Sequence, residues 1–251
     1  MGRTEPLYMK VAASVRDRIR TGELAPGDHT PTDRDLAAEH GIGRATAARA
    51  LDLLVSEGLV TPGLGRAGRR VRDTRILPIH ASRTENMERR RSAGVDAWVT
   101  DTEEAGREPG QTINVSVVHA GPEIARWLEL DEETPVAVRR RVRTLDGAPS
   151  NRADTYYPME IAQAIQEILN PGDIPHGVLA LMAEQGYTTD YYLDALRWRP
   201  PTPEEAQVLS IGQGVSVIVQ SRTGYQEGRP IHLTRTTWPG NNIELRYELP
   251  A

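Results

Sequence analysis

A small cluster of side chains able to read nucleic acid lies in the first fifth of the chain. Arg44 and Thr46 alternate with Gly43 and Ala45, and Arg49 follows one helical turn later. Arginine and threonine side chains can bond guanine edges and phosphate oxygens when the first turn of a helix lies in the major groove of DNA. These residues predict a DNA-reading surface, and the alternative interpretation is a solvated basic face on a helical hairpin.

A stretch rich in glycine and arginine follows, over residues 61–72. Its glycines permit the positive φ values of a tight hairpin, and its four arginines suit phosphate contact or entry into the minor groove. Gly63, Gly65 and Gly68 also match the spacing of a dinucleotide-binding fingerprint, but the residues after them offer no apolar helical stripe, which that fingerprint needs. The DNA contacts predicted in this hairpin are Gly65, Arg66, Gly68 and Arg69.

Three helices are expected to hold these residues in place. Thr32 and Asp35 have the spacing of a capping box, and Gly41 suits the left-handed residue that ends a helix. The next helix is predicted over residues 43–57, with a buried stripe formed by Ala47, Ala50, Leu51, Leu54 and Val55. An earlier helix that ends at Gly22 is predicted from the apolar repeat Leu7, Val11, Val15 and Ile19.

Short motifs run through the first third of the chain in a fixed order: Pro6-Leu7-Tyr8, Gly22-x-Leu24-x-Pro26-Gly27, the run from Pro31 to Ala37, Gly41-Ile42-Gly43-Arg44-x-Thr46, Ala50-Leu51, Leu54 and Glu57-Gly58-Leu59-Val60. In this order they resemble the DNA-binding domain of GntR-family transcriptional regulators. The resemblance implies a winged helix-turn-helix over residues 1–75. It also implies that Arg34, Arg44 and Thr46 contact DNA and that the wing enters the minor groove.

Two departures from the family pattern lie on the helix that would read DNA. Gly43 replaces the usual serine and so removes a side-chain cap. Ala48 replaces the usual arginine, and Arg49 cannot simply substitute for it, because one residue is about 100° of helix rotation. We therefore expect DNA binding to persist with a preferred site that differs from the family's usual one.

Charge divides the chain into two parts. Residues 1–75 hold 13 Lys+Arg and 10 Asp+Glu, a net of +3, and the rest holds 17 and 25, a net of −8. The positive residues 1–75 can bind the phosphates of nucleic acid, whereas the negative remainder of the chain is repelled by them. The 251 residues fit two domains, and the absence of cysteine excludes disulfides, zinc-thiolate sites and cysteine nucleophiles. With no signal pattern and no long apolar run, we expect a cytoplasmic protein without a membrane partner.

The remaining two-thirds predict an α+β fold over residues 96–251, after a polar linker over 76–95 that includes Arg89-Arg90-Arg91. The predicted strands are Thr112–Val118, Pro135–Leu145, Asn151–Tyr157, Asp190–Arg197, Val215–Arg222, Pro230–Trp238 and Glu244–Leu249. The predicted helices are Ala97–Ala105, Pro122–Leu128, Met159–Leu169, Gly177–Gln185 and Pro203–Leu209. Hairpin turns at 146–147 and 226–228, with helices between hairpins, predict a mostly antiparallel sheet with helices on one face.

A looser set of motifs spans residues 76–250: Gly106-x-x-Pro109-Gly110, Leu130, Pro135-Val136, Arg141-Val142-Arg143, Asp146-Gly147-x-Pro149, Tyr157-Pro158, Pro203-x-x-Glu205-Ala206 and, after an isolated Arg222, Arg229-Pro230-Ile231. This part is similar to the effector-binding UTRA domain of the HutC subfamily of GntR regulators, which has a chorismate-lyase-like fold. The resemblance implies a small molecule between the sheet and the first helix, with Arg141 and Arg143 at the anion-binding positions. Alternation puts both arginines on one face of a strand, although a solvated arginine strand is the alternative.

The predicted effector site also departs from sugar-binding relatives. Trp98 and Val99 stand in place of a Ser/Thr-rich helix start, and Ala153 and His232 stand where those relatives carry glutamate. Because both changes remove partners for sugar hydroxyls, we expect an anionic or aromatic effector. The predicted effector-binding residues are Trp98, Val99, Arg141, Arg143, Ala153, Tyr156, Tyr225, His232 and Trp238.

The sequence as a whole predicts a ligand-responsive transcriptional regulator. We expect a repressor that binds a near-palindromic double-stranded DNA operator as a homodimer and is released by a small molecule. Two alternatives are a DNA-binding protein whose C-terminal domain only dimerises, and a chorismate-lyase-like enzyme. We expect no catalytic residue, cofactor or metal site, because the six histidines have no metal-binding spacing and no nucleophile motif is present.

Overall fold

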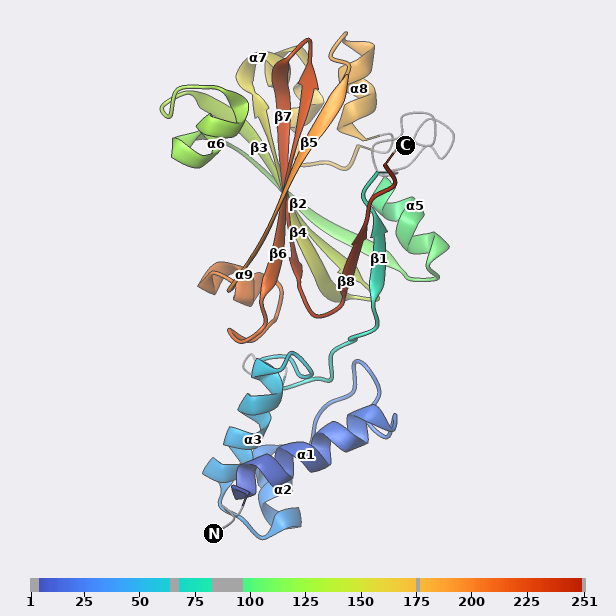
Figure 1. Cartoon of the computed structure of the whole chain (residues 1–251), viewed down its shortest axis with the longest axis vertical. Coiled ribbons are helices and arrows are strands. Elements are labelled where there is room, and N and C mark those ends of the chain that lie inside the picture. Colours follow the sequence, from blue (N-terminus) through green and yellow to red (C-terminus); the bar gives the residue numbers. More distant parts are fainter. Residues whose placement is uncertain (1–4, 64–67, 83–96, 175–176, 250–251) are drawn as a thin grey trace. The chain divides into compact units, whose positions relative to one another are not determined.

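The computed structural model of the chain describes residues 5–63, 68–82, 97–174 and 177–249 (Figure 1). The chain forms two compact units. One comprises residues 1–77, 200–216 and 239–242, and the other comprises residues 78–199, 217–238 and 243–251. The first unit, called the head below, therefore combines the N-terminal segments with two short segments from late in the sequence. The second is called the sheet unit.

Three helices form the core of the head: α1 (Leu7–Arg20), α2 (Asp33–His40) and α3 (Arg44–Ser56). The capping box predicted at the start of α2 is present, because the Asp35 amide donates to Thr32 Oγ1 at 3.2 Å and the Thr32 amide donates to Asp35 Oδ2 at 3.1 Å. The α2 helix ends at Gly41, whose φ of 63° is left-handed. The apolar stripes of the three helices meet in a core formed by Val11, Val15, Leu36, Ala47, Ala50, Leu51 and Leu54.

The predicted hairpin after α3 pairs through its two arms. The Thr61 amide donates to the Arg70 carbonyl at 2.8 Å, and the Arg72 amide donates to the Leu59 carbonyl at 2.9 Å. On its other side the second arm accepts a bond from the Thr30 amide at 3.0 Å. The arm is thus held between two neighbouring stretches of chain. Its tip, with the predicted DNA contacts Gly65 and Arg66, lies outside the described residues.

A six-stranded sheet with the order β2-β3-β4-β7-β6-β5 forms most of the sheet unit. Its strands are β2 (Pro109–His119), β3 (Pro135–Leu145), β4 (Ala148–Pro158), β5 (Tyr191–Arg199), β6 (Val217–Gln226) and β7 (Arg229–Pro239). The pairs β2–β3, β3–β4, β4–β7 and β5–β6 are antiparallel. Both predicted hairpin turns are present, each with two residues at positive φ: Asp146 and Gly147, then Glu227 and Gly228.

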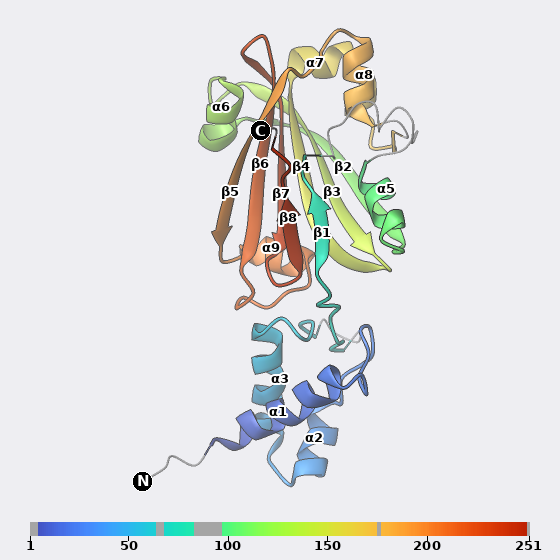
Figure 2. The ribbon, with the colours of Figure 1, turned by 45° about the vertical axis from the view of Figure 1, so that its right-hand side comes forward.

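A second, two-stranded sheet joins β1 (Leu77–His80) to β8 (Ile243–Arg246). Strand β1 falls where the sequence predicted a linker. Four residues carry too weak an alternation to identify a strand whose partner lies more than 160 residues away, so this pairing has no local signal. Figure 2 shows β1 and β8 lying over one face of the larger sheet.

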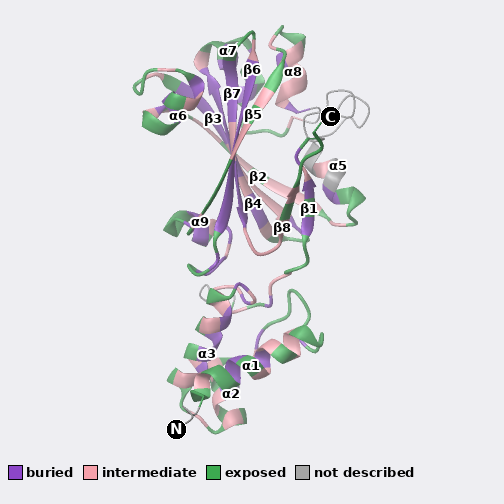
Figure 3. Ribbon diagram, in the orientation of Figure 1, coloured by how far each residue is buried: buried purple, intermediate pink, exposed green. Residues whose placement is uncertain are grey.

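The sequence predicted helices on one face of the sheet, and this prediction is wrong. The helices of the sheet unit lie on both faces. They are α5 (Ala97–Glu104), α6 (Gly121–Leu128), α7 (Met159–Ala164) and α8 (Val178–Glu184), with a 3₁₀ turn at Gln166–Leu169. The α6 helix packs on Val136, Val138 and Tyr156, whereas α7 and α8 share a core with Ala137 and Tyr157. Because neighbouring strand residues point to opposite faces, these cores define an α6 face and an α7–α8 face. Figure 3 shows that the central strands between them are largely buried.

One further helix differs from the sequence prediction, and another agrees with it but lies in the other unit. The helix predicted over Met159–Leu169 is broken at Ile165, where φ is −125° and ψ is 85°, into α7 and the 3₁₀ turn. The α9 helix (Pro203–Val208) agrees with prediction, with a capping box between Thr202 and Glu205, but it belongs to the head.

Candidate functional sites

The first turn of α3 presents its side chains to solvent. Gly43, Arg44 and Ala45 are exposed and Thr46 is half-buried, while the next residue, Ala47, is fully buried. Arg34, on α2, is exposed as well. Within the described part of the chain, neither Arg34 nor Arg44 forms a hydrogen bond or ion pair through its side chain. Two guanidinium groups are therefore available to an external anion.

Two other predicted DNA contacts are engaged inside the head. The Arg69 guanidinium bonds Asp33 at 3.0 Å and Asp52 at 2.5 Å, so it ties the hairpin to α2 and α3. The Arg49 guanidinium lies over the ring of Tyr8, 4.0 Å from its centroid. A cation that already has two carboxylate partners has less to gain from phosphate, so Arg69 is less available to DNA than Arg44.

The four arginines of β3 have different roles. Arg139 is buried and donates to the carbonyl oxygens of Glu167, Ile168 and Gly172 at 3.1, 3.2 and 2.9 Å and also to that of Asn170. Its burial lowers its pKa. It therefore fastens the 3₁₀ turn to the sheet. Arg140 points to the α6 face, where it bonds Ser116 Oγ at 2.8 Å. Arg141 and Arg143 alternate onto the α7–α8 face.

The pairing register places polar residues in one row across four strands of the α7–α8 face. Arg143 of β3 is opposite Gln111 of β2 and Asn151 of β4. Asn151 and Trp238 are adjacent to the paired residues Arg152 and Thr237 and lie on the other face of the sheet from them. The row therefore reads Gln111, Arg143, Asn151, Trp238.

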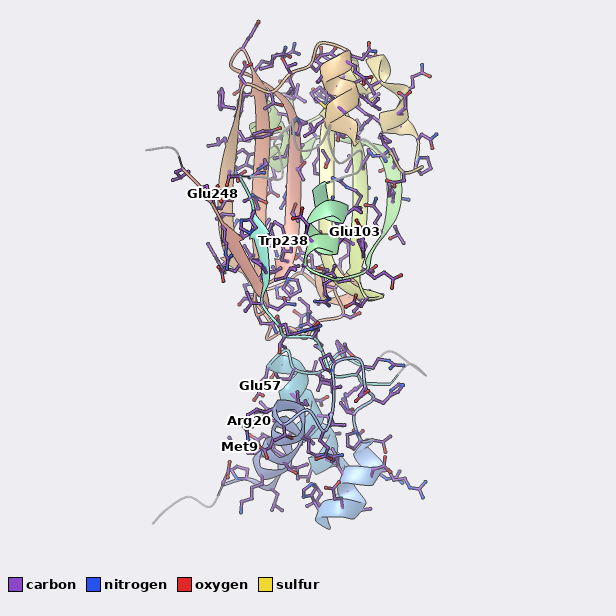
Figure 4. The ribbon with its side chains drawn as sticks, turned by 90° about the vertical axis from the view of Figure 1, so that its right-hand side faces the viewer. Met9, Arg20, Glu57, Glu103, Trp238 and Glu248 are labelled. Carbon is purple, nitrogen blue, oxygen red and sulfur yellow. The ribbon has the colours of Figure 1, made fainter. Side chains whose placement is uncertain are left out.

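A second row lies one step along the strands and contains the other arginine. Arg141 is opposite Ile113 and Ala153, and its Nη2 donates to Thr155 Oγ1 at 2.6 Å. The α5 helix and the β1–β8 pair lie over this same face of the sheet, and Figure 4 shows Trp238 of β7 and Glu103 of α5 in one view of it. Two cations and several uncharged polar groups thus share a covered face, a setting able to hold a small anion.

Comparison with known families decides the assignment. Residues 7–67 match the bacterial regulatory proteins of the gntR family, and residues 104–244 match the UTRA domain. The chain belongs to the GntR family. It is a DNA-binding transcriptional regulator with a UTRA domain for effector binding.

Relatives across the whole length agree with the family assignment. This GntR regulator is 30% identical over 245 residues to the HTH-type transcriptional regulator RB1450 of Rhizobium meliloti, covering 96% of this chain and 94% of that one. It is 25% identical over 241 residues to the HTH-type transcriptional repressor NagR of Bacillus subtilis, covering 94% and 91%. These relatives are regulators, so the family relationship does not support the lyase alternative.

Solved structures share the fold over the full chain. A crystal structure of a GntR-family transcriptional regulator has a TM-score of 0.59 at 23% identity and covers 98% of both chains. PhnF from Mycobacterium smegmatis has a TM-score of 0.57 at 21% identity, covering 96% of this chain and 99% of that one. At these identities the comparison shows the α+β architecture of a winged head and an antiparallel UTRA sheet.

The structure brings five of the predicted effector residues of this GntR regulator onto one face: Arg141, Arg143, Ala153, His232 and Trp238. His232 is buried, with its ring 6.3 Å from that of Tyr157 and 6.0 Å from that of Tyr192. Val99 is half-buried on α5, and the side chain of Trp98 lies outside the described residues.

Two predicted effector residues lie on the other face of the sheet. Tyr156 packs in the α6 core, where burial raises its pKa, and Tyr225 stacks on Tyr191 with ring centroids 4.8 Å apart. Strand alternation is the reason, because Tyr156 is three residues from Ala153 and so points the opposite way. Asn151, which the sequence did not predict for the site, lies among the polar residues of the α7–α8 face. Its signal in the sequence was its even spacing from Ala153 on the same strand.

Among the described residues, His, Asp and Glu side chains form no group able to hold a metal ion. In the same part of the chain, none of the helices combines the length and the apolar character that crossing a membrane requires.

Proposed function

We propose that this regulator is a repressor that binds a near-palindromic operator as a homodimer and leaves it when a small anion binds the UTRA domain. The observation that carries the proposal is Arg44 on the first turn of α3, which is exposed and has no side-chain hydrogen bond or ion pair with another described residue. A twofold-related pair of such turns would read two half-sites about one helical repeat of DNA apart. The repressor role is supported by the name of the relative NagR.

The proposed DNA contacts fall into three groups. Gly43, Arg44, Ala45 and Thr46 would face base edges, with Arg34 and Arg49 beside them. Gly65, Arg66 and Gly68 would contact the backbone or the minor groove from the wing. Arg69 would act mainly by fixing the wing to Asp33 and Asp52.

The proposed effector site uses Arg141 and Arg143 on the α7–α8 face, with Ala153, His232 and Trp238 beside them. Strand β7 carries Trp238, and the chain then continues directly into residues 239–242 of the head. There the Asn241 amide nitrogen donates to the Gly58 carbonyl at 3.3 Å, just after the end of α3. An effector that bound one arrangement of these segments more tightly than another would shift the population of DNA-binding heads.

The remaining assignments extend the same proposal. The DNA-binding domain would span residues 1–75 and the effector-binding and dimerisation domain residues 96–251, joined by 76–95. The motifs of the second domain favour the HutC subfamily, and a transcription factor of this kind acts in the cytoplasm. A domain that only dimerised would show no saturable binding of small anions.

The test of DNA reading is the Arg44→Ala variant, with Arg20→Ala as a charge-matched control because Arg20 is exposed on α1 and paired with Asp17. Fluorescence anisotropy would measure binding to the DNA upstream of the protein's own gene and to a scrambled duplex, across a salt series. Arg44→Ala should cost roughly 1–3 kcal/mol on the specific site and little on the scrambled one. An unchanged ratio between the two duplexes would remove Arg44 from sequence reading.

The matching test of effector response is Arg143→Ala. It should leave operator affinity unchanged while abolishing release by effector, because Arg143 lies in the sheet unit and not in the head. Retained release would place the effector elsewhere.

A further inference from the structure

Asn151 of β4 is a buried polar residue whose side chain the fold leaves unsatisfied. It is fully buried, and neither the oxygen nor the nitrogen of its side-chain amide has a hydrogen-bond partner among the described residues. A buried amide that loses its bonds to water without replacing them opposes folding. Asparagine is also poorly suited to the middle of a strand. Folding alone does not explain this residue.

Two other residues in the row of Asn151, Trp238 and Gln111, also have a buried polar atom without a hydrogen bond to a described residue. The buried indole Nε1 of Trp238, on the next strand, has no acceptor within the part of the chain that the structure describes. On the far side of Arg143, Gln111 donates through Nε2 to Asp173 at 3.0 Å, but its buried Oε1 receives no bond from any described residue. Three residues of one cross-strand row therefore present unsatisfied groups to the same covered face of the sheet.

These groups specify the chemistry of a ligand. Arg143 and Arg141 are positive groups on the same face, and a guanidinium group can bond a negatively charged ligand. Asn151 Nδ2 and Trp238 Nε1 are donors and can bond acceptor oxygens of a ligand, whereas Asn151 Oδ1 and Gln111 Oε1 are acceptors and each need a donor. A plain anion offers acceptors only and would leave both oxygens unpaired. A molecule with an O–H or N–H group next to its charge satisfies both kinds.

We propose that Asn151 is a specificity-determining residue of the effector site, and that the effector is a small anion with a hydroxyl or N–H donor beside its charged group. The inference rests on the proposed effector site around Arg143 and extends it from charge to hydrogen-bond pattern. A site built to bond a ligand hydroxyl rejects the analogue without it, because the buried groups of the site are then left unpaired.

Matched carboxylates test the inference directly. The probes are propionate with lactate, and succinate with malate, where each pair differs by one hydroxyl group. Ligand-observed NMR at millimolar concentration would give the Kd of each probe for the full-length protein. We expect the hydroxylated member of a pair to bind roughly 5- to 10-fold more tightly, the ratio that one net hydrogen bond provides.

Asn151→Leu should erase this preference while keeping carboxylate binding that depends on Arg143. Asn151→Ala serves as a second variant in case leucine overfills the position. Asn114→Leu is the matched control, because Asn114 is exposed and alternates onto the α6 face. Without ligand, Asn151→Leu should melt no earlier than the wild type, since an unsatisfied buried amide is removed.

The outcomes separate this inference from the proposed function. Equal binding of both members of each pair to the wild type, or a preference that survives in both Asn151 variants, would overturn the inference. If that binding is still lost in Arg143→Ala, the proposed anion site stands. Failure of every carboxylate to bind would overturn both, and operator binding, measured separately, would still test the head.

Discussion

The loop that leads into β6 passes so close to the end of α3 that two of its residues leave no room for a side chain. A Cβ added at Gly212 would lie 2.4 Å from the carbonyl oxygen of Val55, and one added at Gly214 would lie 2.5 Å from that of Ser56. Both obstacles are backbone atoms of a helix end, which cannot rotate away as a flexible side chain would. Gly212→Ala must therefore displace the loop from α3.

The expected magnitude follows from two opposing effects. Overpacking that forces backbone shifts costs roughly 1–3 kcal/mol. Replacing glycine by alanine restricts the unfolded chain and returns about 0.4–1 kcal/mol where the native backbone tolerates alanine. No left-handed φ applies at Gly212, so only the clash opposes the substitution. We expect the head to lose about 1–2 kcal/mol of unfolding free energy.

The distribution of tryptophan makes the assay selective. All four tryptophans of the sequence, at positions 98, 127, 198 and 238, belong to the sheet unit, whereas α1 and α3, the longest helices described, belong to the head. Urea unfolding followed by far-ultraviolet circular dichroism therefore reports strongly on the head, and tryptophan fluorescence reports on the sheet unit.

Gly212→Ala should move the dichroism transition to lower urea, with a smaller shift or none in fluorescence. Gln213→Ala is the matched control, because Gln213 is exposed in the same loop. If the dichroism midpoint of Gly212→Ala coincides with that of Gln213→Ala, the close packing of the loop on α3 does not stabilise the head.

Two further predictions concern caps and charges. Thr32→Ala removes the acceptor of the Asp35 amide and should lower the unfolding free energy of the head by about 1 kcal/mol, whereas Thr32→Ser should retain it; equal losses in both variants would contradict the capping role. At Asp194 burial favours the neutral acid, but bonds from Arg222 at 2.6 and 2.7 Å outweigh it and hold the carboxyl pKa below 3.8. Because the pKa is lowered on folding, this stabilisation is present above pH 3.8 and is lost as the pH falls through the folded value, so Asp194→Asn should flatten the acid side of a fluorescence-monitored stability profile. An acid limb identical to that of the wild type would exclude Asp194 as its source.

The parts of the fold with local signals were predictable from the sequence. The Thr32–Asp35 capping box and the left-handed Gly41 fix the ends of α2, and Asp146-Gly147 fixes the β3–β4 turn. Each signal acts within a few residues, so it survives without knowledge of the tertiary structure. For the same reason β3, bounded by a proline and a turn, has the predicted limits Pro135–Leu145.

The parts set by distant contacts were not predictable in the same way. Strand β1 exists because β8 pairs with it, and the α7–α8 and α6 cores appear only once helices are placed on both faces. Strand alternation alone places Tyr156 and Ala153 on opposite faces of the sheet, so the predicted effector site combines residues of both faces. The sequence does not mark Asn151, because the cost of an isolated asparagine on a strand depends on its burial and on its lack of partners among the described residues.

The arginines show why counting charges cannot locate a functional surface. Arg44 and Arg69 both lie in the part of the chain with a net charge of +3, and both suit phosphate contact by residue type. Yet Asp33 and Asp52 bond Arg69, whereas Arg44 has no such partner among the described residues. In β3 the Arg139 guanidinium likewise donates to four carbonyl oxygens. A positive residue that already has a fixed partner stabilises the fold, whereas an exposed arginine such as Arg44, with no carboxylate partner in the described part of the chain, can give its full charge to a phosphate.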